Sequence, residues 1–451
     1  MGIRQFFRQS RQSFSRSPFL LQLAKGARTA FLVQVSGVGL TYIVQIFLAR
    51  WLGTVEFGIY EYVVSCVLLL AIFAGLGLPT AVLRFIAQYQ VTQQWSQLSG
   101  LIQGTRRITL GFGVVIAVVT TVFMVTFQNP DWIYFTPFLI GVWIVPLMSL
   151  VQLQAEMARA FNKIILAYAP FGFVVPCLVL VGAFILSKTS FNLTSESVLG
   201  LLVGSLVIIV LSQWRVLQHQ LQHEYQLTTP QYQTWEWLQV AFPLLLQGVS
   251  RVVLSQTDIL MIGTLVNPES VGIYSAAVRT SIWTSFVLQA VNTVAAPMFT
   301  RLYMQKDHAS LQSLVATLAH WIFWPSLILS VTLIGFANPI LSLFGSEFFA
   351  ARLPMTILIL GQLVNVGCGS VGYLMVMTGH QNQSATILGC TAFLNIILNA
   401  ITIPRFGIAG AAFSTTLTLS ILNILLHILV VRYLNVYPSI IYAIFSRARS
   451  I

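Results

Sequence analysis

Long apolar runs with almost no charge recur along the whole of this sequence. Each run is about 20 residues long, which is the length that an α-helix needs to cross the hydrocarbon core of a bilayer. Barrel strands would alternate apolar and polar residues, and open sheets would leave backbone groups unpaired in lipid. The runs therefore predict an all-α integral membrane protein with about 12 transmembrane helices. They lie near residues 31–49, 59–78, 108–127, 132–151, 164–186, 198–214, 240–265, 271–297, 315–337, 353–378, 384–402 and 407–431.

The composition leaves little room for a soluble domain. Only 8% of the 451 residues are charged and 57% are hydrophobic, whereas about a quarter of the residues in a soluble domain are charged. The four cysteines lie inside apolar runs and form no Cys-x-x-Cys pair, so we expect neither a disulfide nor a metal site. No P-loop and no hydrolase or metalloprotease motif occurs in the sequence. We therefore expect no cofactor, no catalytic residues and no enzymatic activity.

The basic residues are unevenly placed between the runs. The formal net charge is +12, which in a soluble chain would suggest a nucleic-acid partner. If the N-terminus is cytoplasmic, most of the 23 Lys and Arg residues fall in cytoplasmic segments, as the positive-inside rule requires. We therefore expect both termini in the cytoplasm, membrane lipids as the surroundings, and no nucleic-acid partner.

The positions of the runs divide the chain into five segments. We expect a cytoplasmic N-terminal segment, residues 1–28, whose arginines and aromatic residues take opposite faces of a helix on the membrane surface. Two six-helix bundles follow, at 29–214 and 240–432. A cytoplasmic linker at 215–239 joins them, and a cytoplasmic tail at 433–451 ends the chain.

The two halves share a sequence pattern. Leu52-Gly53-Thr54 follows the first run and precedes Phe57-Gly58-Ile59-Tyr60, while Ile262-Gly263-Thr264 follows the seventh run and precedes Val271-Gly272-Ile273-Tyr274. Two copies of six crossings have the same orientation in the membrane, so an axis along the membrane normal relates them. Pseudo-symmetric halves of this kind are typical of transporters that work by alternating access.

Four groups of residues carry a resemblance to a known superfamily. They are Ala49-Arg50-Trp51-Leu52-Gly53 through Phe57-Gly58-Ile59-Tyr60; Gln256-Thr257-Asp258 through Gly263, followed by Gly272 to Ala277; Asn395 to Asn399 through Ile403 to Ala412; and Gly75-Leu76-Gly77-Leu78 with Arg84. In order and spacing they resemble the multidrug/oligosaccharidyl-lipid/polysaccharide exporter superfamily, and within it the Wzx-type polysaccharide-flippase branch. The similarity extends from about residue 30 to about residue 420.

The resemblance implies a MATE-like fold and a specific activity. A protein of this branch is expected to translocate a polyprenyl diphosphate-linked oligosaccharide across the bacterial inner membrane by alternating access. The product would serve surface polysaccharide or lipopolysaccharide biosynthesis. A polysaccharide polymerase and chain-length proteins are the partners that this implies.

Two arginines lie at a depth where lipid disfavours charge. Arg251 in the seventh run and Arg279 in the eighth lie at similar depths, given the rise of about 1.5 Å per residue of a helix. Guanidinium groups suit phosphate geometry, so we hypothesise that both face a central cavity and bind the substrate's phosphates. The alternative is a structural salt bridge, in which Asp258, two turns above Arg251, is the acidic partner.

Polar stripes follow the same helices. Gln247, Arg251 and Asp258 share a face of the seventh helix with two serines, and Gln34, Thr41 and Gln45 share a face of the first. Polar stripes in lipid must face protein or water. We expect them to line a wet, sugar-binding cavity; interhelical hydrogen bonding is the alternative.

The remaining ionisable candidates lie nearer the helix ends. Glu61, near the outer start of the second helix, and Asp258 are candidates for proton or cation coupling, or simple partners for arginine. Arg84 and Arg301 lie at cytoplasmic helix ends, where they either attract an anionic headgroup at the entrance or only set the topology.

Two other functions compete with the flippase. A cation-coupled multidrug antiporter of the same superfamily would need a deep acidic site, but the apolar runs hold more arginine than acid. A membrane polysaccharide polymerase would need a sizeable external loop with catalytic residues, and the connections here are short. We therefore expect the flippase.

Overall fold

The protein is helical throughout its described part. The computed structural model describes residues 18–189, 193–224 and 229–442, with side chains described at 35–189, 193–219 and 229–442. All regular elements in these ranges are helices, which confirms the all-α prediction. In chain order they are α2 (Pro18–Gly75), α3 (Leu78–Val91), α4 (Trp95–Phe127), α5 (Phe135–Gly141), α6 (Ile144–Ala160), α7 (Ile164–Ala169), the π-helix η1 (Pro170–Val174), α8 (Val175–Lys188), α9 (Ser195–Glu224), α10 (Thr234–Leu265), α11 (Pro268–Ser281), the 3₁₀-helix η2 (Ile282–Ser285), α12 (Phe286–Met304), α13 (His308–Gly335), α14 (Ala337–Ser342), the 3₁₀-helix η3 (Ser346–Ala351), α15 (Arg352–Cys368), α16 (Val371–Met377) and α17 (Gln381–Leu434).

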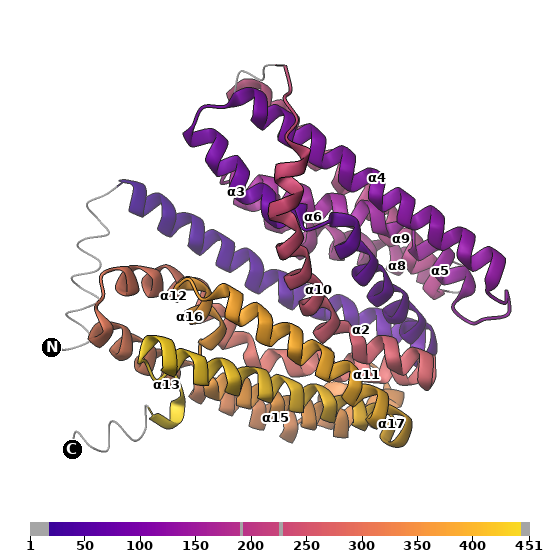
Figure 1. The fold of residues 1–451 in the computed structure, drawn as a ribbon. Helices are drawn as coiled ribbons and strands as arrows, with labels where there is room; N and C mark the ends of the chain where they lie inside the picture. Colours follow the sequence, from indigo (N-terminus) through magenta and orange to yellow (C-terminus); the bar gives the residue numbers. More distant parts are fainter. Residues whose placement is uncertain (1–17, 190–192, 225–228, 443–451) are drawn as a thin grey trace.

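Ten stretches of the described chain are long and apolar enough to cross a membrane. Two of them include a hairpin, because α2 turns back at Gly53 and α17 turns back at Gly407 (Figure 1). The two glycines have φ of 74° and 57°, a region that side chains disfavour. The start of α2 and the end of α17 lie at the same end of the molecule (Figure 1). The count of twelve crossings and the cytoplasmic position of both termini stay predictions.

The first described helix begins before the first apolar run. α2 begins at Pro18 and continues into the first crossing, so residues 18–28 of the expected N-terminal segment belong to this helix. Residues 1–17 lie outside the described residues, as does the tail from residue 443. The helix on the membrane surface therefore stays a prediction.

Several helices extend beyond their apolar runs. Most of the linker expected at 215–239 is helical, since α9 continues to Glu224 and α10 begins at Thr234. Likewise, α4 begins at Trp95, well before the run that starts at residue 108. Backbone hydrogen bonds can continue along a helix after it leaves the lipid, where polar side chains are solvated. Apolar runs therefore mark the membrane-buried part of a helix and not its ends.

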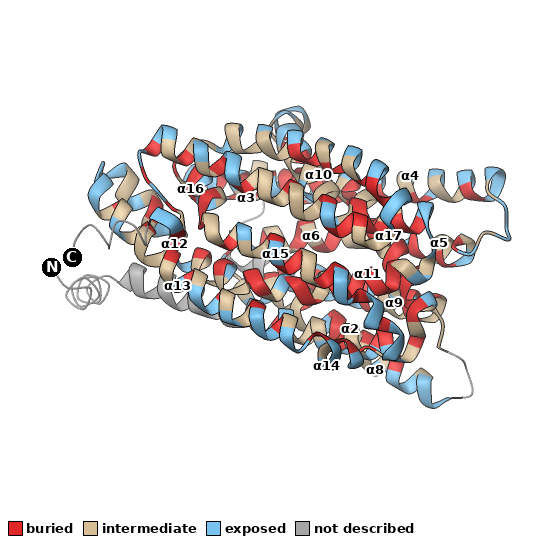
Figure 2. Cartoon of the chain, turned by 90° about the horizontal axis from the view of Figure 1, so that it is seen from below, coloured by how far each residue is buried: buried red, intermediate tan, exposed pale blue. Residues whose placement is uncertain are grey.

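The helices form two bundles with α2 and α10 between them (Figure 1). One bundle contains α3 to α9 and the other contains α11 to α17. Buried positions gather where α2, α6 and α11 meet, while exposed positions follow the outer faces of α4 and α13 (Figure 2). These outer faces are apolar: Val119 of α4 is 62% exposed and Ile328 of α13 is 66% exposed. Apolar faces of this extent suit lipid and not water, so the chain is a multi-pass membrane protein.

The two halves meet most closely at the matching glycines of the repeat. A β-carbon added to Gly58 of α2 would lie 1.8 Å from the carbonyl oxygen of Pro268, and one added to Gly272 of α11 would lie 2.2 Å from that of Thr54. The backbones of the two helices are therefore in direct contact, and each glycine faces the helix that carries the other. This reciprocal contact joins the halves at the end opposite to the start of α2.

Two hydrogen bonds also join the halves. The hydroxyl groups of Tyr42 and Thr280 are 3.0 Å apart and join the first arm of α2 to α11. The hydroxyl of Ser65 donates to Oε1 of Gln256 at 2.8 Å and joins the second arm of α2 to α10. The two pairs are equivalent in the sequence repeat. Tyr42 and Gln256 lie on the first helix of their halves, and Thr280 and Ser65 lie on the second helix of the opposite halves. The pseudo-symmetry expected from the motifs thus has a counterpart in side-chain contacts.

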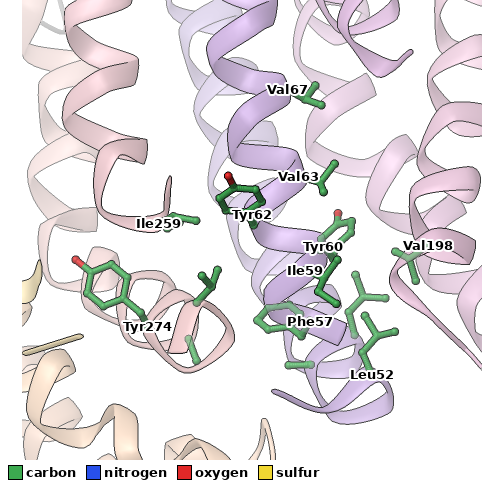
Figure 3. Close-up of a cluster of buried hydrophobic side chains, with 14 of the residues drawn as sticks. Leu52, Phe57, Ile59, Tyr60, Tyr62, Val63, Val67, Val198, Ile259 and Tyr274 are labelled. Carbon is green, nitrogen blue, oxygen red and sulfur yellow. The ribbon is translucent and has the colours of Figure 1, made fainter. Parts of the chain in front are cut away.

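Helix α10 is anchored in both bundles. At its start, the fully buried Trp237 donates from Nε1 to the Tyr89 hydroxyl at 3.1 Å, and the backbone at Ala241 lies against Gly77, where a β-carbon would be 2.1 Å from the Ala241 carbonyl oxygen. Toward its end, α10 packs against α17 of the second bundle and against the second arm of α2, where Tyr62 and Ile259 lie on either side of the contact (Figure 3). α10 therefore connects the two bundles physically as well as in sequence.

Replacement of Gly58 by alanine is expected to separate the halves. The added β-carbon would overlap a backbone carbonyl that cannot rotate away, so the unfolding free energy should fall by about 1–3 kcal/mol, as for other overpacked sites. The matched control is Gly111→Ala in α4, where a β-carbon meets nothing within 4 Å and the helix should be slightly stabilised. Thermal unfolding midpoints of the two purified variants test this. Equal midpoints would mean that the contact is not tight.

Candidate functional site

A cavity lies where the first arm of α2 meets the opposite half. Its volume is about 540 Å³, which is within the range of small-molecule sites. Its walls come from α2, α7, η1, α11, η2, α12 and α16. The lining residues are Val35, Gly37, Val38, Thr41, Tyr42, Gln45, Tyr168, Phe171, Gly172, Arg279, Ile282, Trp283, Phe286, Gln289, Ala290, Thr293 and Tyr373. We call this the central cavity.

A close contact between two glycines forms one side of the central cavity. A β-carbon on Gly37 would lie 2.8 Å from the Cα of Gly172, so α2 touches the π-helix η1 without an intervening side chain. η1 begins at Pro170, which has no backbone N–H to donate. Short π-helical turns of this kind often occur at functional sites.

Aromatic side chains form the opposite side of the central cavity. The rings of Tyr42 and Trp283 meet edge to face with centroids 5.7 Å apart, and Trp283 lies 5.3 Å from the ring of Phe286. Tyr42 also meets Phe344 at 5.8 Å, and Phe344 in turn meets Phe348. Phe344 and Phe348 are fully buried. The cavity is therefore closed by aromatic packing on the side toward α14 and η3.

An ion pair between the halves borders the central cavity. The Nη2 group of Arg279 on α11 donates to the two carboxylate oxygens of Glu61 on α2, at 3.1 and 3.5 Å. The Glu61 side chain is 1% exposed and the Arg279 side chain is 35% exposed. Glu61 is thus enclosed by protein, while Arg279 also faces the cavity. The expectation that Glu61 is a partner for arginine is confirmed.

A second, smaller cavity lies inside the C-terminal half. Its volume is about 260 Å³, and Arg279 lines it as well. The buried carboxylate of Asp258 faces it and accepts hydrogen bonds from Tyr274 (2.6 Å), Asn399 (2.8 Å) and Thr415. These donors come from α11 and from both arms of α17, so the carboxylate of Asp258 on α10 holds three elements together.

The alternative pairing of Arg251 with Asp258 is wrong. The partners of Asp258 are neutral, and Arg251 is exposed and has no ion pair within the described chain. The reason is the distance along α10, because the side chain of Arg251 starts two turns away from Asp258. Tyr274 and Asn399 lie on helices packed directly beside Asp258, and they donate to its oxygens instead. Arg251 also lines neither cavity, whereas Arg279 lines both.

The structure divides the other predicted site residues into three groups. Thr41 and Gln45 line the central cavity, and Gln34 lies outside the residues whose side chains are described. Gln247 is half-buried on α10 and lines neither cavity. Arg301 is exposed near the end of α12, whereas Arg84 is exposed in the middle of α3, so its expected place at a helix end is wrong; neither lines a cavity.

Sequence patterns did not identify the η2–α12 wall of the central cavity. Trp283 and Phe286 lie in an apolar run, where the sequence does not distinguish an aromatic residue that faces the cavity from one that faces lipid. Gln289 and Thr293 are four residues apart and therefore share a face of α12. This polar spacing is the sequence signal that could have identified the cavity-facing side of the helix. Asn395 and Asn399 show the same spacing, and Asn399 is a partner of Asp258.

Together, the fold and the central cavity, which polar and aromatic side chains of both halves line, define a membrane protein with two helical bundles and a site between them. A family model described as "Polysaccharide biosynthesis protein" matches residues 23–303, which is more than half of the chain. The chain belongs to this family, and the resemblance found in its sequence motifs is confirmed. A second family model, described as MatE, matches residues 243–401.

A curated relative is similar over part of the chain. It is described as a probable low-salt glycan biosynthesis flippase of Haloferax volcanii and is 27% identical over 191 residues. The match covers 41% of this chain and 39% of the relative, so it spans about two fifths of the relative's length.

Two solved structures have a similar fold. One is the lipid II flippase MurJ in an inward closed conformation, with a TM-score of 0.69, 16% identity, and coverage of 88% of this chain and 87% of that one. The other is a multidrug resistance MATE family transporter of the MOP superfamily in an inward-facing conformation, with a TM-score of 0.70, 12% identity, and coverage of 90% and 98%. These similarities confirm the expected MATE-like fold.

Removal of Arg279 is expected to destabilise the protein more than a neutral change in Glu61. Arg279→Ala leaves the enclosed Glu61 carboxylate unpaired, and breaking a buried pair costs about 3–5 kcal/mol; the partial exposure of Arg279 places the loss at the lower end. Glu61→Gln keeps an acceptor for Nη2 and should cost less. Unfolding midpoints of both single variants and the double variant form a cycle that measures the coupling. A coupling near zero would contradict the pairing.

Removal of the Asp258 carboxylate is expected to loosen the C-terminal half. In Asp258→Ala two buried donors, Tyr274 and Asn399, and the half-buried Thr415 lose their acceptor, and each buried unpaired group costs about 1–3 kcal/mol. Asp258→Asn keeps the shape and one acceptor oxygen, so its unfolding midpoint should lie between those of Asp258→Ala and the wild type. An Asp258→Ala protein as stable as the wild type would contradict this role.

Proposed function

We propose that this protein is a flippase that moves a lipid-linked oligosaccharide across a membrane by alternating access. The substrate would be an oligosaccharide on a polyprenyl diphosphate, made for surface polysaccharide or lipopolysaccharide biosynthesis. The proposal rests chiefly on one observation: the central cavity lies between the two halves and presents Thr41, Gln45 and Arg279 to its interior. Membership of the polysaccharide biosynthesis family and the flippase description of a relative support it.

The inter-half contacts suggest how access would alternate. The contact of Gly58 with Gly272 and the ion pair of Glu61 with Arg279 close one end of the molecule, the end that the positive-inside rule assigns to the outside. A substrate would then enter from the cytoplasmic side. A diphosphate near Arg279 competes with Glu61 for the same guanidinium group, because both are anionic acceptors. Loss of the ion pair would release the halves at the outer end and let the cavity open there.

The arginine roles in this mechanism differ. Arg279 lines both cavities and is the residue that we propose binds phosphate there. Arg251 is exposed on α10 without a partner among the described residues, and we propose that it binds phosphate on the way into the cavity. Arg84, exposed in the middle of α3, and Arg301, exposed near the end of α12, are proposed to attract the anionic headgroup earlier still.

A cationic-drug antiporter is supported less well. Such a protein needs an acidic group that faces the transported cation, but Glu61 is paired with Arg279 and the Asp258 carboxylate is occupied by three donors. We also propose that the protein performs no covalent chemistry on its substrate. The proposed location is the bacterial inner membrane, with a polysaccharide polymerase and chain-length proteins acting after it.

Reconstituted transport tests the proposed function. The full chain in liposomes that contain a fluorescent polyprenyl diphosphate disaccharide should make the labelled sugar accessible to an impermeant quencher faster than protein-free liposomes do. Arg279→Ala should lower the rate at least about tenfold, which is about 1.4 kcal/mol in a barrier, and Arg251→Ala should lower it less. Arg405→Ala, an exposed arginine at the α17 turn, is the control that should leave the rate unchanged.

A deletion strain of the source organism gives an independent result. Loss of the protein should cause a lipid-linked oligosaccharide to accumulate on the cytoplasmic face, and complementation should remove it. Wild-type export in cells that contain normal amounts of the Arg279→Ala protein would contradict the role of this residue. No accumulation in the deletion strain and no transport in liposomes would overturn the flippase itself.

A further inference from the structure

The connection between α13 and α15 lies against the opposite half of the protein. It contains α14 and η3, residues 337–351, and in sequence it belongs to the C-terminal half. Two of its side chains, Phe344 and Phe348, are fully buried. The ring of Phe348 meets that of Phe57 with centroids 6.1 Å apart, and the ring of Phe344 meets Tyr42. Since Phe57 and Tyr42 both belong to α2, two aromatic side chains of one half are inserted against the other half.

A hydrogen bond and a glycine turn shape the α14–η3 connection. The hydroxyl of Thr54 donates to Oε2 of Glu347 at 3.3 Å, which joins η3 to the turn of α2. Gly345, between α14 and η3, has φ of 144°, in a region that glycine adopts readily and other residues do not. The chain turns there, so Phe344 and Phe348 on either side of it meet in one cluster. The connection therefore bends at a glycine and is held to the other half at its exposed edge.

The N-terminal half has an equivalent connection. Residues 128–134 join α4 to α5, and the hydroxyl of Tyr134 donates to the carbonyl oxygen of Gly263 at 3.2 Å. In the sequence repeat Gly263 matches Gly53, which precedes Thr54. Each half therefore reaches across to the turn that follows the first crossing of the other half. The repeat thus extends to the contacts that hold this end of the molecule together.

Of these two connections, the α14–η3 connection is the one that contacts the lining of the central cavity. Tyr42, which meets Phe344, lines the cavity, whereas Tyr134 lines neither cavity. The Tyr42 hydroxyl is also 3.0 Å from that of Thr280, which follows Arg279 on α11. A movement of α11 away from α2 would break this hydrogen bond and loosen the contact of Tyr42 with Phe344. The α11 helix that carries Arg279 and the α14–η3 connection are therefore linked through one side chain.

We propose that residues 337–351 form a lid that seals the central cavity from the outside and lifts from α2 before the substrate leaves. The outside is the end that the positive-inside rule assigns to it. Phe344 and Phe348 form the seal, Glu347 holds the lid to α2, and Gly345 provides the bend, as hinge residues of lids do. This inference rests on the proposed alternating access, and it adds the segment that performs the outer step.

Labelling of the cavity from each side tests the lid. In a background without the four native cysteines, Thr41→Cys places a thiol in the cavity lining. A membrane-impermeant maleimide should label this thiol slowly in right-side-out vesicles and quickly in inside-out vesicles. Phe348→Ala should raise the rate from the outside at least about tenfold, because it removes a buried contact that stabilises the closed state. The matched control is Phe349→Ala, whose side chain is 44% exposed and whose loss should not change the rate.

Two results of the labelling experiment would overturn the proposal. One is rapid labelling of the Thr41→Cys protein from the outside, because the lid would then not seal the cavity. The other is an equal rate in folded Phe348→Ala and Phe349→Ala proteins, because the buried ring would then have no part in the seal.

A cross-link gives a second test that leaves the aromatic side chains of the lid intact. In the same background, Thr54→Cys and Glu347→Cys are joined by a short bifunctional methanethiosulfonate that a reducing agent removes. The cross-linked protein should stop transporting the fluorescent polyprenyl diphosphate disaccharide in liposomes, and reduction should restore transport. The control pair, Glu56→Cys with Ser195→Cys, joins two contacting residues of one half and should leave transport unchanged. Transport at the normal rate by the cross-linked lid protein would contradict the proposal.

The two experiments separate the lid from the flippase function on which it rests. Labelling needs no substrate, so its outcome does not depend on transport. If the labelling rates are as expected but no glycolipid is transported, the lid stands and the flippase function fails. If the glycolipid is transported equally well with and without the cross-link, the flippase function stands and the lid is wrong.

Discussion

The direct backbone contact between Gly58 and Gly272 is the constraint on which the arrangement of the two halves depends. In lipid there is no hydrophobic force to bring helices together, so association relies on close packing and on hydrogen bonds between them. The glycines provide the close approach, and the ion pair of Glu61 with Arg279 lies about one turn inside it. The central cavity exists because the halves touch at this end and surround the polar side chains behind it.

Much of the fold was predictable from the sequence because lipid imposes simple rules. Apolar runs located the long helices, and the Gly53 turn and the repeated glycine motif located a hairpin and the pseudo-symmetric halves. The same rules explain what failed. Helix ends could not be found, because a helix such as α9 continues after its apolar run ends. The inward face of Trp283 could not be found either, because protein-facing and lipid-facing aromatic residues look alike in sequence.

The candidate site was predicted in part. Thr41, Gln45 and Arg279 were identified as polar residues at depth, and all three line the central cavity. Their partners were less accessible to sequence analysis: Glu61 lies 218 positions from Arg279, and only the packing of α2 against α11 brings them together. The alternative pairing of Asp258 with Arg251 rested on their proximity on one helix, but helices packed beside Asp258 supply hydroxyl and amide donors at shorter range.

The anchoring of α10 in both bundles has a consequence for how the molecule divides. By sequence the second half starts with this helix, yet Trp237 at its beginning is fixed to Tyr89 in the first bundle, while Asp258 near its end is fixed to α11 and α17. A rigid-body rocking of one bundle against the other cannot leave α10 unchanged. If the bundles move apart, α10 has to bend, and Pro243 inside it is the position where a helix kinks most readily.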